Sequence, residues 1–137
     1  MSDDLATNQR LCPFCTPDAS RVFLDAELVL GIWDGFPVSP SHALLIPRRH
    51  VTDWFQASAD EKAALTSAID QARTFIEERA ASEGRPKPAG YNVGFNAGSA
   101  AGQTVFHLHV HVIPRYQGDV ADPKGGVRGV IPGKATY

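Results

Sequence analysis

The residues of this chain that could carry chemistry are its five histidines and two cysteines. Three histidines, His107, His109 and His111, alternate with apolar residues in one short run. Successive side chains of a β-strand point to opposite faces, so on a strand these imidazoles share one face, about 6.6 Å apart. The apolar residues of the run then face the core: Phe106, Leu108, Val110 and Val112.

Three interpretations of this histidine run are open. It could be a half-buried strand whose polar face happens to be rich in histidine. It could hold a catalytic metal through two histidines and a third ligand from elsewhere, although His107 and His111 are too far apart to share one ion with bonds of about 2.0–2.1 Å. It could instead act by nucleophilic catalysis, in which a neutral imidazole attacks phosphorus and the flanking histidines orient it or supply protons.

The segment before the histidine run favours the nucleophilic interpretation. Residues 96–104 contain Gly98 and Gly102 among other small residues. A loop of this kind exposes backbone N–H groups, which suit phosphate oxygens. The side-chain amides of Asn96 and Gln103 add further donors. The sequence therefore predicts a phosphate-binding loop next to the histidine strand, with a simple turn as the alternative.

The two cysteines, Cys12 and Cys15, have the Cys-x-x-Cys spacing of a metal knuckle. Zinc would need two further ligands. A redox pair would call for a thioredoxin-like βαβ context, which the pattern of elements lacks, and two free thiols are the remaining alternative. Two cysteines are too few for a disulfide scaffold, and we expect a reducing, cytoplasmic compartment.

The elements that position these residues follow from apolar patterning. The segment from Ser58 to Glu61 fits a capping box, and we expect a helix from there to about Ala81, with one apolar face and Gly84 at its end. Apolar runs rich in Val, Leu and Ile predict five strands, over 22–24, 26–33, 42–46, 91–95 and 104–113. This order indicates an α+β fold with a largely antiparallel five-stranded sheet and one long helix packed on it.

Length and composition bound the function. A chain of 137 residues is expected to be one domain, 1–137, with a loose N-terminal arm over 1–11 and a Gly/Pro-rich tail over 119–137. With a formal charge of −2, the chain lacks the strong positive field of a general nucleic-acid binder. No apolar run approaches the roughly 20 residues that span a bilayer, and the polar N-terminus lacks a signal core. We therefore expect a soluble cytoplasmic protein with neither nucleic acid nor membrane as partner.

Two stretches carry a resemblance to a known family. Residues 96–115, NAGSAAGQTVFHLHVHVIPR, contain the complete pattern His-φ-His-φ-His-φ-φ, where φ is apolar. Residues 34–50 contain the run HALLIPRRH. Both resemble signatures of the histidine triad (HIT) family of nucleotide hydrolases and transferases, in the family's order and separated by a helix. The resemblance covers most of residues 12–118 and implies a HIT-like fold.

The resemblance implies a role for each histidine of the chemistry. His109, the middle histidine of the triad, is similar to the nucleophile that attacks the α-phosphorus of a nucleotide and holds the nucleoside monophosphate until water releases it. His111 is similar to the residue that contacts the scissile phosphate and helps the leaving group. His42 resembles the family's supporting histidine, which is hydrogen-bonded behind the triad.

The resemblance also implies the substrate contacts. Gln103 resembles a donor to the α-phosphate or the bridging oxygen, Thr104 a further phosphate contact, and Asn96 an amide-bearing position found in part of the family. Asp34 matches the position of a ligand to the ribose hydroxyls, and a carboxylate can accept from both of them. The alternative role of Asp34 is that of a turn residue before Gly35.

For the cysteine pair, many HIT proteins with this N-terminal motif resemble zinc binders. Their other two ligands are the histidine after the Ile-Pro signature and the first histidine of the triad, which correspond to His50 and His107. The resemblance thus implies a closed, structural Cys2His2 zinc site formed with Cys12 and Cys15, which leaves His109 free as nucleophile.

Residues 102–105 and 114–119 resemble the branch that contains the fragile-histidine-triad and bacterial dinucleoside polyphosphate hydrolases. This implies a diadenosine polyphosphate (Ap4A-type) hydrolase that releases AMP, and a homodimer as in much of the family. The alternatives are a nucleoside phosphoramidate hydrolase of the Hint-like branch and a non-catalytic nucleotide-binding module. Three cations of the tail could meet the distal phosphates, or simply be solvated: Lys124, Arg128 and Lys134.

Overall fold

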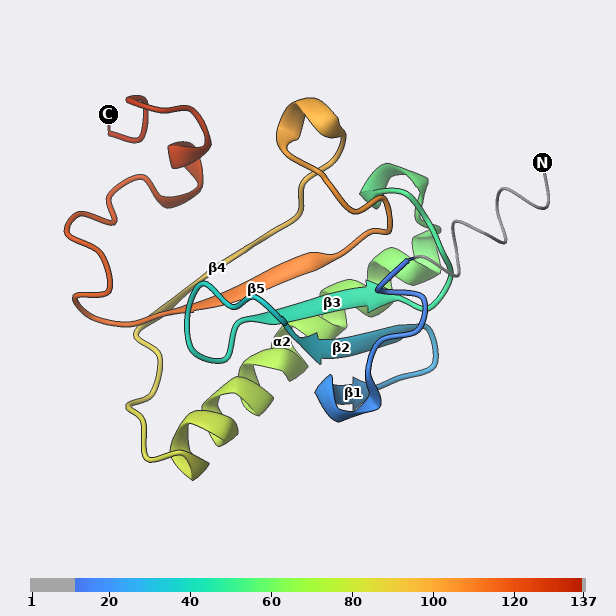
Figure 1. Ribbon diagram of the computed structural model, residues 1–137, viewed down its shortest axis with the longest axis horizontal. Coiled ribbons are helices and arrows are strands. Elements are labelled where there is room, and N and C mark those ends of the chain that lie inside the picture. The colour runs from blue at the N-terminus through green and yellow to red at the C-terminus, as the bar shows by residue number, and fades with distance from the viewer. Residues whose placement is uncertain (1–11, 137) are drawn as a thin grey trace.

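The computed structural model describes residues 12–136, and the expected N-terminal arm over 1–11 lies outside them. Five antiparallel strands form one sheet in the order β1-β2-β3-β5-β4 (Figure 1). Its strands are β1 (Val22–Asp25), β2 (Val29–Trp33), β3 (Ala43–Pro47), β4 (Gly90–Gly94) and β5 (Val110–Arg115). The predicted α+β fold, with an antiparallel five-stranded sheet and one long helix on it, is confirmed.

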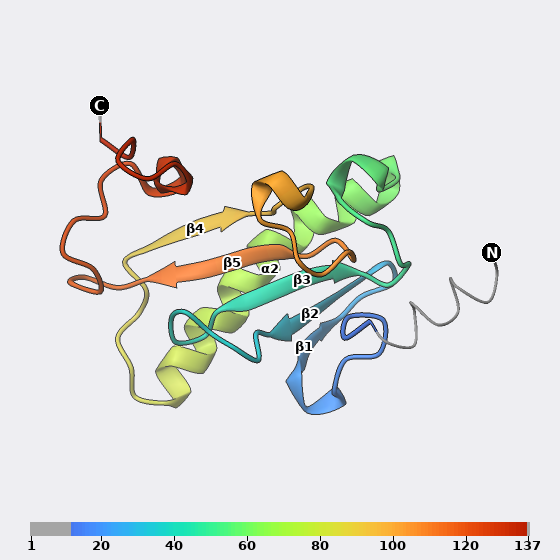
Figure 2. The ribbon, with the colours of Figure 1, turned by 45° about the horizontal axis from the view of Figure 1, so that its top comes forward.

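The long helix α2 (Ala59–Ser82) covers one face of the sheet (Figure 2). It begins at the predicted capping box: the hydroxyl of Ser58 accepts from the N–H of Glu61 at 3.1 Å, and the Glu61 carboxylate accepts from the N–H of Ser58 at 2.8 Å. The buried stripe of the helix, with Leu65 and Ile76 fully enclosed, packs on β2, β3 and β5. No helix of residues 12–136 is long and apolar enough to cross a membrane.

The opposite face of the sheet carries a second, smaller apolar cluster. Its buried members come from β2, β3 and the N-terminal segment: Ile32, Leu44, Ile46, Cys12 and Phe14. Because alternate residues of a strand point to opposite faces, β3 gives Leu45 to the helix side and Leu44 to this side. His111 is the partner of Leu44 in the ladder, so the triad lies on the side away from the helix.

The histidine strand is shorter than the sequence predicts. β5 begins at Val110 rather than at residue 104, because its ladder with β3 ends there. Before that point the chain leaves the sheet, and the N–H of Leu108 donates to the carbonyl of Val51 at 2.8 Å. Phe106, predicted to face the core, is 46% exposed as a result. Leu108 stays buried, so the predicted alternation still holds next to the strand.

The helix ends as the sequence predicts, at a glycine in left-handed conformation. Gly84 has φ +69° and follows the C-cap residue Glu83. Its N–H donates to the carbonyl of Ala81 at 3.1 Å, and the N–H of Arg85 donates to that of Ala80 at 2.8 Å. This pair of bonds is a Schellman motif, which satisfies the last helical carbonyls and turns the chain.

The Gly/Pro-rich tail runs past the end of β5 and turns back on the side of β4 (Figure 1). There it forms a short 3-10 helix, η4 (Gly126–Val130). Two apolar side chains of this helix, Val127 and Val130, remain 66% and 74% exposed. The tail therefore contributes little to the core.

Replacing Ser58 by Ala removes the capping hydroxyl, and we expect the free energy of unfolding to fall by about 1 kcal/mol. The exposed mid-helix Ser67 offers a matched control, because Ser67→Ala makes the same chemical change away from the cap. Urea denaturation followed by far-UV circular dichroism measures both variants. Equal midpoints for the two would contradict a capping role for Ser58.

Candidate active site and metal centre

Four residues from distant parts of the chain form a Cys2His2 cluster. Cys12 and Cys15 come from the segment before β1, His50 follows β3, and His107 precedes β5. Their ligand atoms all lie within 4.8 Å of one another. His107 Nδ1 is 3.3 Å from Cys12 Sγ and 3.5 Å from Cys15 Sγ, and His50 Nδ1 is 3.0 Å from Cys15 Sγ.

This geometry fits a tetrahedral metal site. With bonds of about 2.3 Å to sulfur and about 2.0–2.1 Å to nitrogen, a tetrahedral ion separates its sulfur and nitrogen ligands by roughly 3.5 Å. The sulfur–nitrogen distances of 3.0, 3.3 and 3.5 Å lie near this value. The fold thus brings together the four residues that the family resemblance implied, and the cluster could bind a metal.

The ring of His107 is oriented for such a role by the main chain. It is fully buried, and its Nε2–H donates to the carbonyl of Pro47 at 2.8 Å. Nδ1 therefore carries the lone pair that faces the thiols, as in metal sites where a carbonyl fixes the tautomer of the ligand. Burial, together with a hydrogen bond to Cys12, raises the pKa of the Cys15 thiol to about 11. A bound cation would lower this pKa and let the thiol ionise.

A main-chain hydrogen bond fixes the tautomer of His109. Its Nδ1–H donates to the carbonyl of His107 at 2.9 Å, and a carbonyl can only accept. Nε2 of the neutral ring therefore keeps its lone pair. Phe14, from between the two cysteines, packs against this ring with centroids 4.9 Å apart. The contact of Phe14 was not predicted from the sequence, and only its place inside the Cys-x-x-Cys motif could have indicated it.

A chain of hydrogen bonds connects His42 with His111, and we name these two residues the histidine relay. The N–H of Val38 donates to His42 Nδ1 at 3.2 Å, so the proton of neutral His42 lies on Nε2. That Nε2–H donates to His111 Nδ1 at 2.9 Å. The proton of neutral His111 therefore lies on Nε2, the nitrogen that the relay does not use.

Both rings of the histidine relay are held neutral by burial. Burial lowers the pKa of His42, against the attraction of Asp34, whose Oδ2 lies 3.4 Å from His42 Nε2. Burial, with the nearby His109 and His42, lowers the pKa of His111 to about 4. Neutral rings fit the hydrogen-bond chain, because a proton on His111 Nδ1 would set two N–H donors against each other.

Asp34 joins the relay to a turn. Its Oδ1 accepts from the N–H of Phe36 at 2.8 Å, which is the turn role considered as the alternative, while Oδ2 lies beside His42. The ligand atoms of Asp34, His42 and His111 lie within 4.8 Å of one another. The Nε2–H of His42 donates to Nδ1 of His111, so these two nitrogens are used in a hydrogen bond. The three residues therefore form a hydrogen-bond chain and not a set of metal ligands with free lone pairs. The ribose contact of Asp34 stays a prediction.

The small-residue loop before the triad is held by Gln103, which is buried. The Gln103 amide donates to the carbonyls of Thr52 at 2.6 Å and Val105 at 3.1 Å, and its oxygen accepts from the N–H of Gly98 at 2.8 Å. Both amide hydrogens are thus used within the protein. A phosphate contact by Gln103 stays a prediction that requires one of these bonds to be exchanged, whereas the predicted contact Thr104 is exposed.

A pocket of about 330 Å³ borders the histidine relay. Its wall includes His42 and His111, the predicted substrate contact Asn96, and the tail residues Val127 and Val130. Apolar side chains make up most of the lining. The three tail cations named above are exposed, on or near η4.

The three alternating histidines lie around the start of β5, and a fourth histidine, His42, is hydrogen-bonded to the last of them. These features place the chain in the class of histidine triad proteins, in agreement with the family comparison. The model of the HIT domain family matches residues 17–118, and the chain belongs to this family. The family expectation drawn from the two sequence signatures is confirmed.

Similar proteins come from several bacteria. An uncharacterized HIT-like protein of Mycoplasma genitalium is 36% identical over 66% of this chain and 60% of its own length. An AP-4-A phosphorylase of Mycobacterium tuberculosis is 32% identical over 78% of this chain and 52% of its own length, so the chain spans little more than half of either relative. A crystal structure of a zinc-bound histidine triad family protein from Mycobacterium smegmatis is 33% identical, with a TM-score of 0.66 over 83% of this chain and 81% of that one.

The buried histidine relay predicts a pH-dependent stability. A histidine of the unfolded chain titrates near pH 6.5, whereas His111 in the fold titrates near 4. Between these values the unfolded state binds the extra proton, so stability that is present at pH 7 is lost as the pH falls, by about 3 kcal/mol for this residue. Chemical denaturation at neutral pH and at about pH 4.5 measures the loss.

The variant His111→Asn isolates this contribution, because its amide cannot titrate and its oxygen can still accept from His42. We expect the difference in unfolding free energy between the two pH values to shrink by about 2–3 kcal/mol. A difference as large as that of the wild-type chain would show that burial does not hold His111 neutral.

Proposed function

We propose that the chain is a nucleotide hydrolase that cleaves at the α-phosphate through a covalent nucleotidyl intermediate on His109. The observation that carries this proposal is the hydrogen bond from His109 Nδ1–H to the carbonyl of His107, at 2.9 Å. It leaves the lone pair on Nε2, and the His109 ring lies next to that of His111, with centroids 5.1 Å apart. An imidazole nitrogen with a free lone pair is a nucleophile for phosphorus.

The proposed reaction has two displacements at the same phosphorus. His109 Nε2 forms a bond to the α-phosphorus while the bond to the leaving oxygen breaks, and that oxygen departs with the electron pair. The Nδ1–H bond to the His107 carbonyl stabilises the positive charge that develops on the ring. Water then attacks the phosphorus, His109 departs with its electron pair, and the water's proton passes to solvent. The product is a nucleoside monophosphate.

The protonation state of His111 supports a polyphosphate as the leaving group. With its pKa lowered to about 4, His111 offers an Nε2–H hydrogen bond at neutral pH but no surplus proton. A polyphosphate departs as a stable anion and needs only that hydrogen bond, whereas an amine must be protonated as it leaves. We therefore propose a diadenosine polyphosphate of the Ap4A type as substrate. The name of the 32% identical AP-4-A phosphorylase points to the same class.

The substrate contacts follow the predicted positions. We propose that the loop before the triad, held in shape by Gln103, meets the phosphates together with Asn96 and the exposed Thr104. Asp34 would accept from the ribose hydroxyls with the oxygen that also lies near His42. The mostly apolar pocket beside the histidine relay would receive part of the leaving group.

The Cys2His2 cluster is proposed to hold a structural zinc. Its four residues would tie the N-terminal segment to the loop after β3 and the loop before β5. A closed set of four ligands leaves no open position for chemistry. The zinc-bound relative supports this choice of metal. We also propose a homodimer: within residues 12–136, β4 pairs only with β5, which leaves a strand edge for a second copy.

His109→Ala removes the proposed nucleophile, and we expect turnover of diadenosine tetraphosphate to fall by several orders of magnitude. Mixing with adenosine-labelled substrate and quenching in alkaline denaturant should leave AMP bound to the wild-type protein and none on the variant, and later acid treatment should release the bound AMP. Circular dichroism checks that the fold persists. Undiminished turnover by His109→Ala would refute the mechanism, and faster cleavage of AMP phosphoramidate than of the tetraphosphate would refute the substrate class.

Metal analysis tests the Cys2His2 cluster. We expect about one zinc per purified chain and its loss in Cys15→Ser, because the remaining three ligands no longer close the site. Chelation should lower the melting temperature, and added zinc should restore it. Chelation that stops turnover while the melting temperature stays unchanged would instead indicate a catalytic metal.

A further inference from the structure

The turn that leads into His42 has a serine at a position where the backbone conformation favours glycine. Residues 39–42 form a turn closed by the N–H of His42, which donates to the carbonyl of Ser39 at 3.0 Å. Pro40 is its second residue, and Ser41, the third, has φ +69°. Proline followed by a residue of positive φ is the type II pattern, in which the third position normally takes glycine. Ser41 is the only non-glycine residue of the described chain with positive φ.

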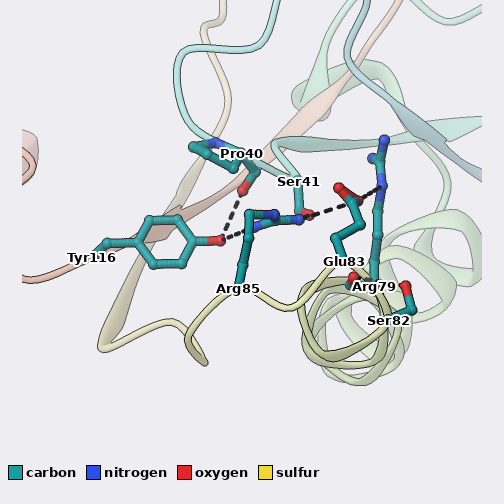
Figure 3. A network of polar contacts seen from close by, with 7 residues as sticks. All are labelled: Pro40, Ser41, Arg79, Ser82, Glu83, Arg85 and Tyr116. Atoms are coloured by element: carbon teal, nitrogen blue, oxygen red, sulfur yellow. Dashed lines mark hydrogen bonds and ion pairs between the residues drawn. The ribbon is translucent and has the colours of Figure 1, made fainter.

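The side chain of Ser41 has a partner that glycine would lack. Arg85 donates from Nη2 to Ser41 Oγ at 2.7 Å (Figure 3). Nη1 of the same guanidinium donates to Tyr116 Oη at 3.1 Å, and the Tyr116 hydroxyl donates to the carbonyl of Pro40 at 2.9 Å. Arg85 thus holds both central residues of the turn, one directly and one through the tyrosine. We name Arg85 and Tyr116 the turn clamp.

The turn clamp is anchored at the end of helix α2. The Schellman motif places Arg85 just beyond the C-cap residue Glu83, whose carboxylate lies 3.3 Å from Arg85 Nη2. Arg79, one helical turn earlier, holds the same carboxylate at 3.0 Å. Figure 3 shows the Arg85 side chain reaching from this helix end to the turn. The anchor is needed because serine rarely adopts the left-handed conformation by itself.

The residue that the turn positions is the donor of the histidine relay. His42 follows Ser41 directly, and its ring must meet two partners at once. Nδ1 accepts from Val38 at 3.2 Å and Nε2–H donates to His111 at 2.9 Å. Hydrogen bonds weaken steeply with misalignment. A relaxation of Ser41 to negative φ would therefore turn the ring away from His111.

We propose that Arg85 is a positioning residue for the reaction: it holds Ser41 in the left-handed conformation and thereby aligns His42 with His111. The inference rests on the proposed function, in which His111 stabilises the leaving group. Arg85 acts through the turn and not on the substrate. Its removal should therefore lower kcat and leave KM nearly unchanged.

Glycine at position 41 provides the deciding test. In Arg85→Ala we expect kcat to fall about 10- to 100-fold, with KM changed less than about twofold. Adding Ser41→Gly to this variant should restore most of kcat, because glycine adopts positive φ without strain. A merely structural role of Arg85 predicts the opposite, since glycine makes the turn more flexible. Ser82→Ala, at the same helix end, is the matched control and should change neither parameter.

The Nε2 proton of His42 gives a readout that does not depend on turnover. His42 is 3% exposed, so this hydrogen-bonded proton should exchange slowly and give a resolved low-field NMR resonance. We expect it to shift or disappear in Arg85→Ala and to return in the double variant. An unchanged resonance in Arg85→Ala, or a double variant that recovers neither kcat nor the resonance, would overturn the proposal.

The NMR resonance also covers the cases in which Arg85→Ala does not fold or the wild-type chain is inactive. If Arg85→Ala does not fold, Ser41→Ala takes its place, because it removes only the hydroxyl that Arg85 holds and should lose the same resonance. If the wild-type chain cleaves no nucleotide, the proposed function fails, and the resonance still decides whether Arg85 aligns His42.

Discussion

Three imidazoles of the site each form a hydrogen bond between one ring nitrogen and the main chain. That bond decides whether the other nitrogen carries the proton or the lone pair. The Pro47 carbonyl takes the Nε2–H of His107, the His107 carbonyl takes the Nδ1–H of His109, and the N–H of Val38 occupies Nδ1 of His42. A neutral ring has only two tautomers, so one backbone bond chooses between them. Identical side chains thereby become a candidate metal ligand at His107, the proposed nucleophile at His109 and a hydrogen-bond donor at His42.

The fold makes these main-chain groups available. β3 is buried along its whole length, ends at Pro47 and begins directly after His42, so one rigid strand positions two of the three rings. The early end of the histidine strand matters as well. Because the chain leaves the ladder before Val110, the carbonyl of His107 can accept from a side chain. A strand that continued to residue 104, as the sequence predicts, would direct that carbonyl into the sheet plane.

The metal cluster and the proposed nucleophile are joined through shared residues. His107 offers Nδ1 to the cysteines and its carbonyl to His109, and Phe14 lies between the two cysteines and packs against the His109 ring. A metal bound in the cluster would therefore restrain His109 through His107 and Phe14, without touching the proposed substrate. In the proposed reaction, the closed metal site would thus act through its neighbours and take no direct part.

Local signals were enough to predict the start of helix α2 at the Ser58 capping box and its end at Gly84. They also predicted the approximate strands and the family. Each of these signals lies within a few neighbouring residues. The candidate reactive residues could be proposed for the same reason. The tertiary structure alone decided which nitrogen of each ring carries the proton, that the Gln103 amide turns inward, and that Arg85 holds Ser41 across 44 positions of sequence. The tautomer of a histidine and the conformation of a strained turn are set by hydrogen bonds to groups that are distant in the sequence. A local sequence pattern does not show which distant group will supply that bond.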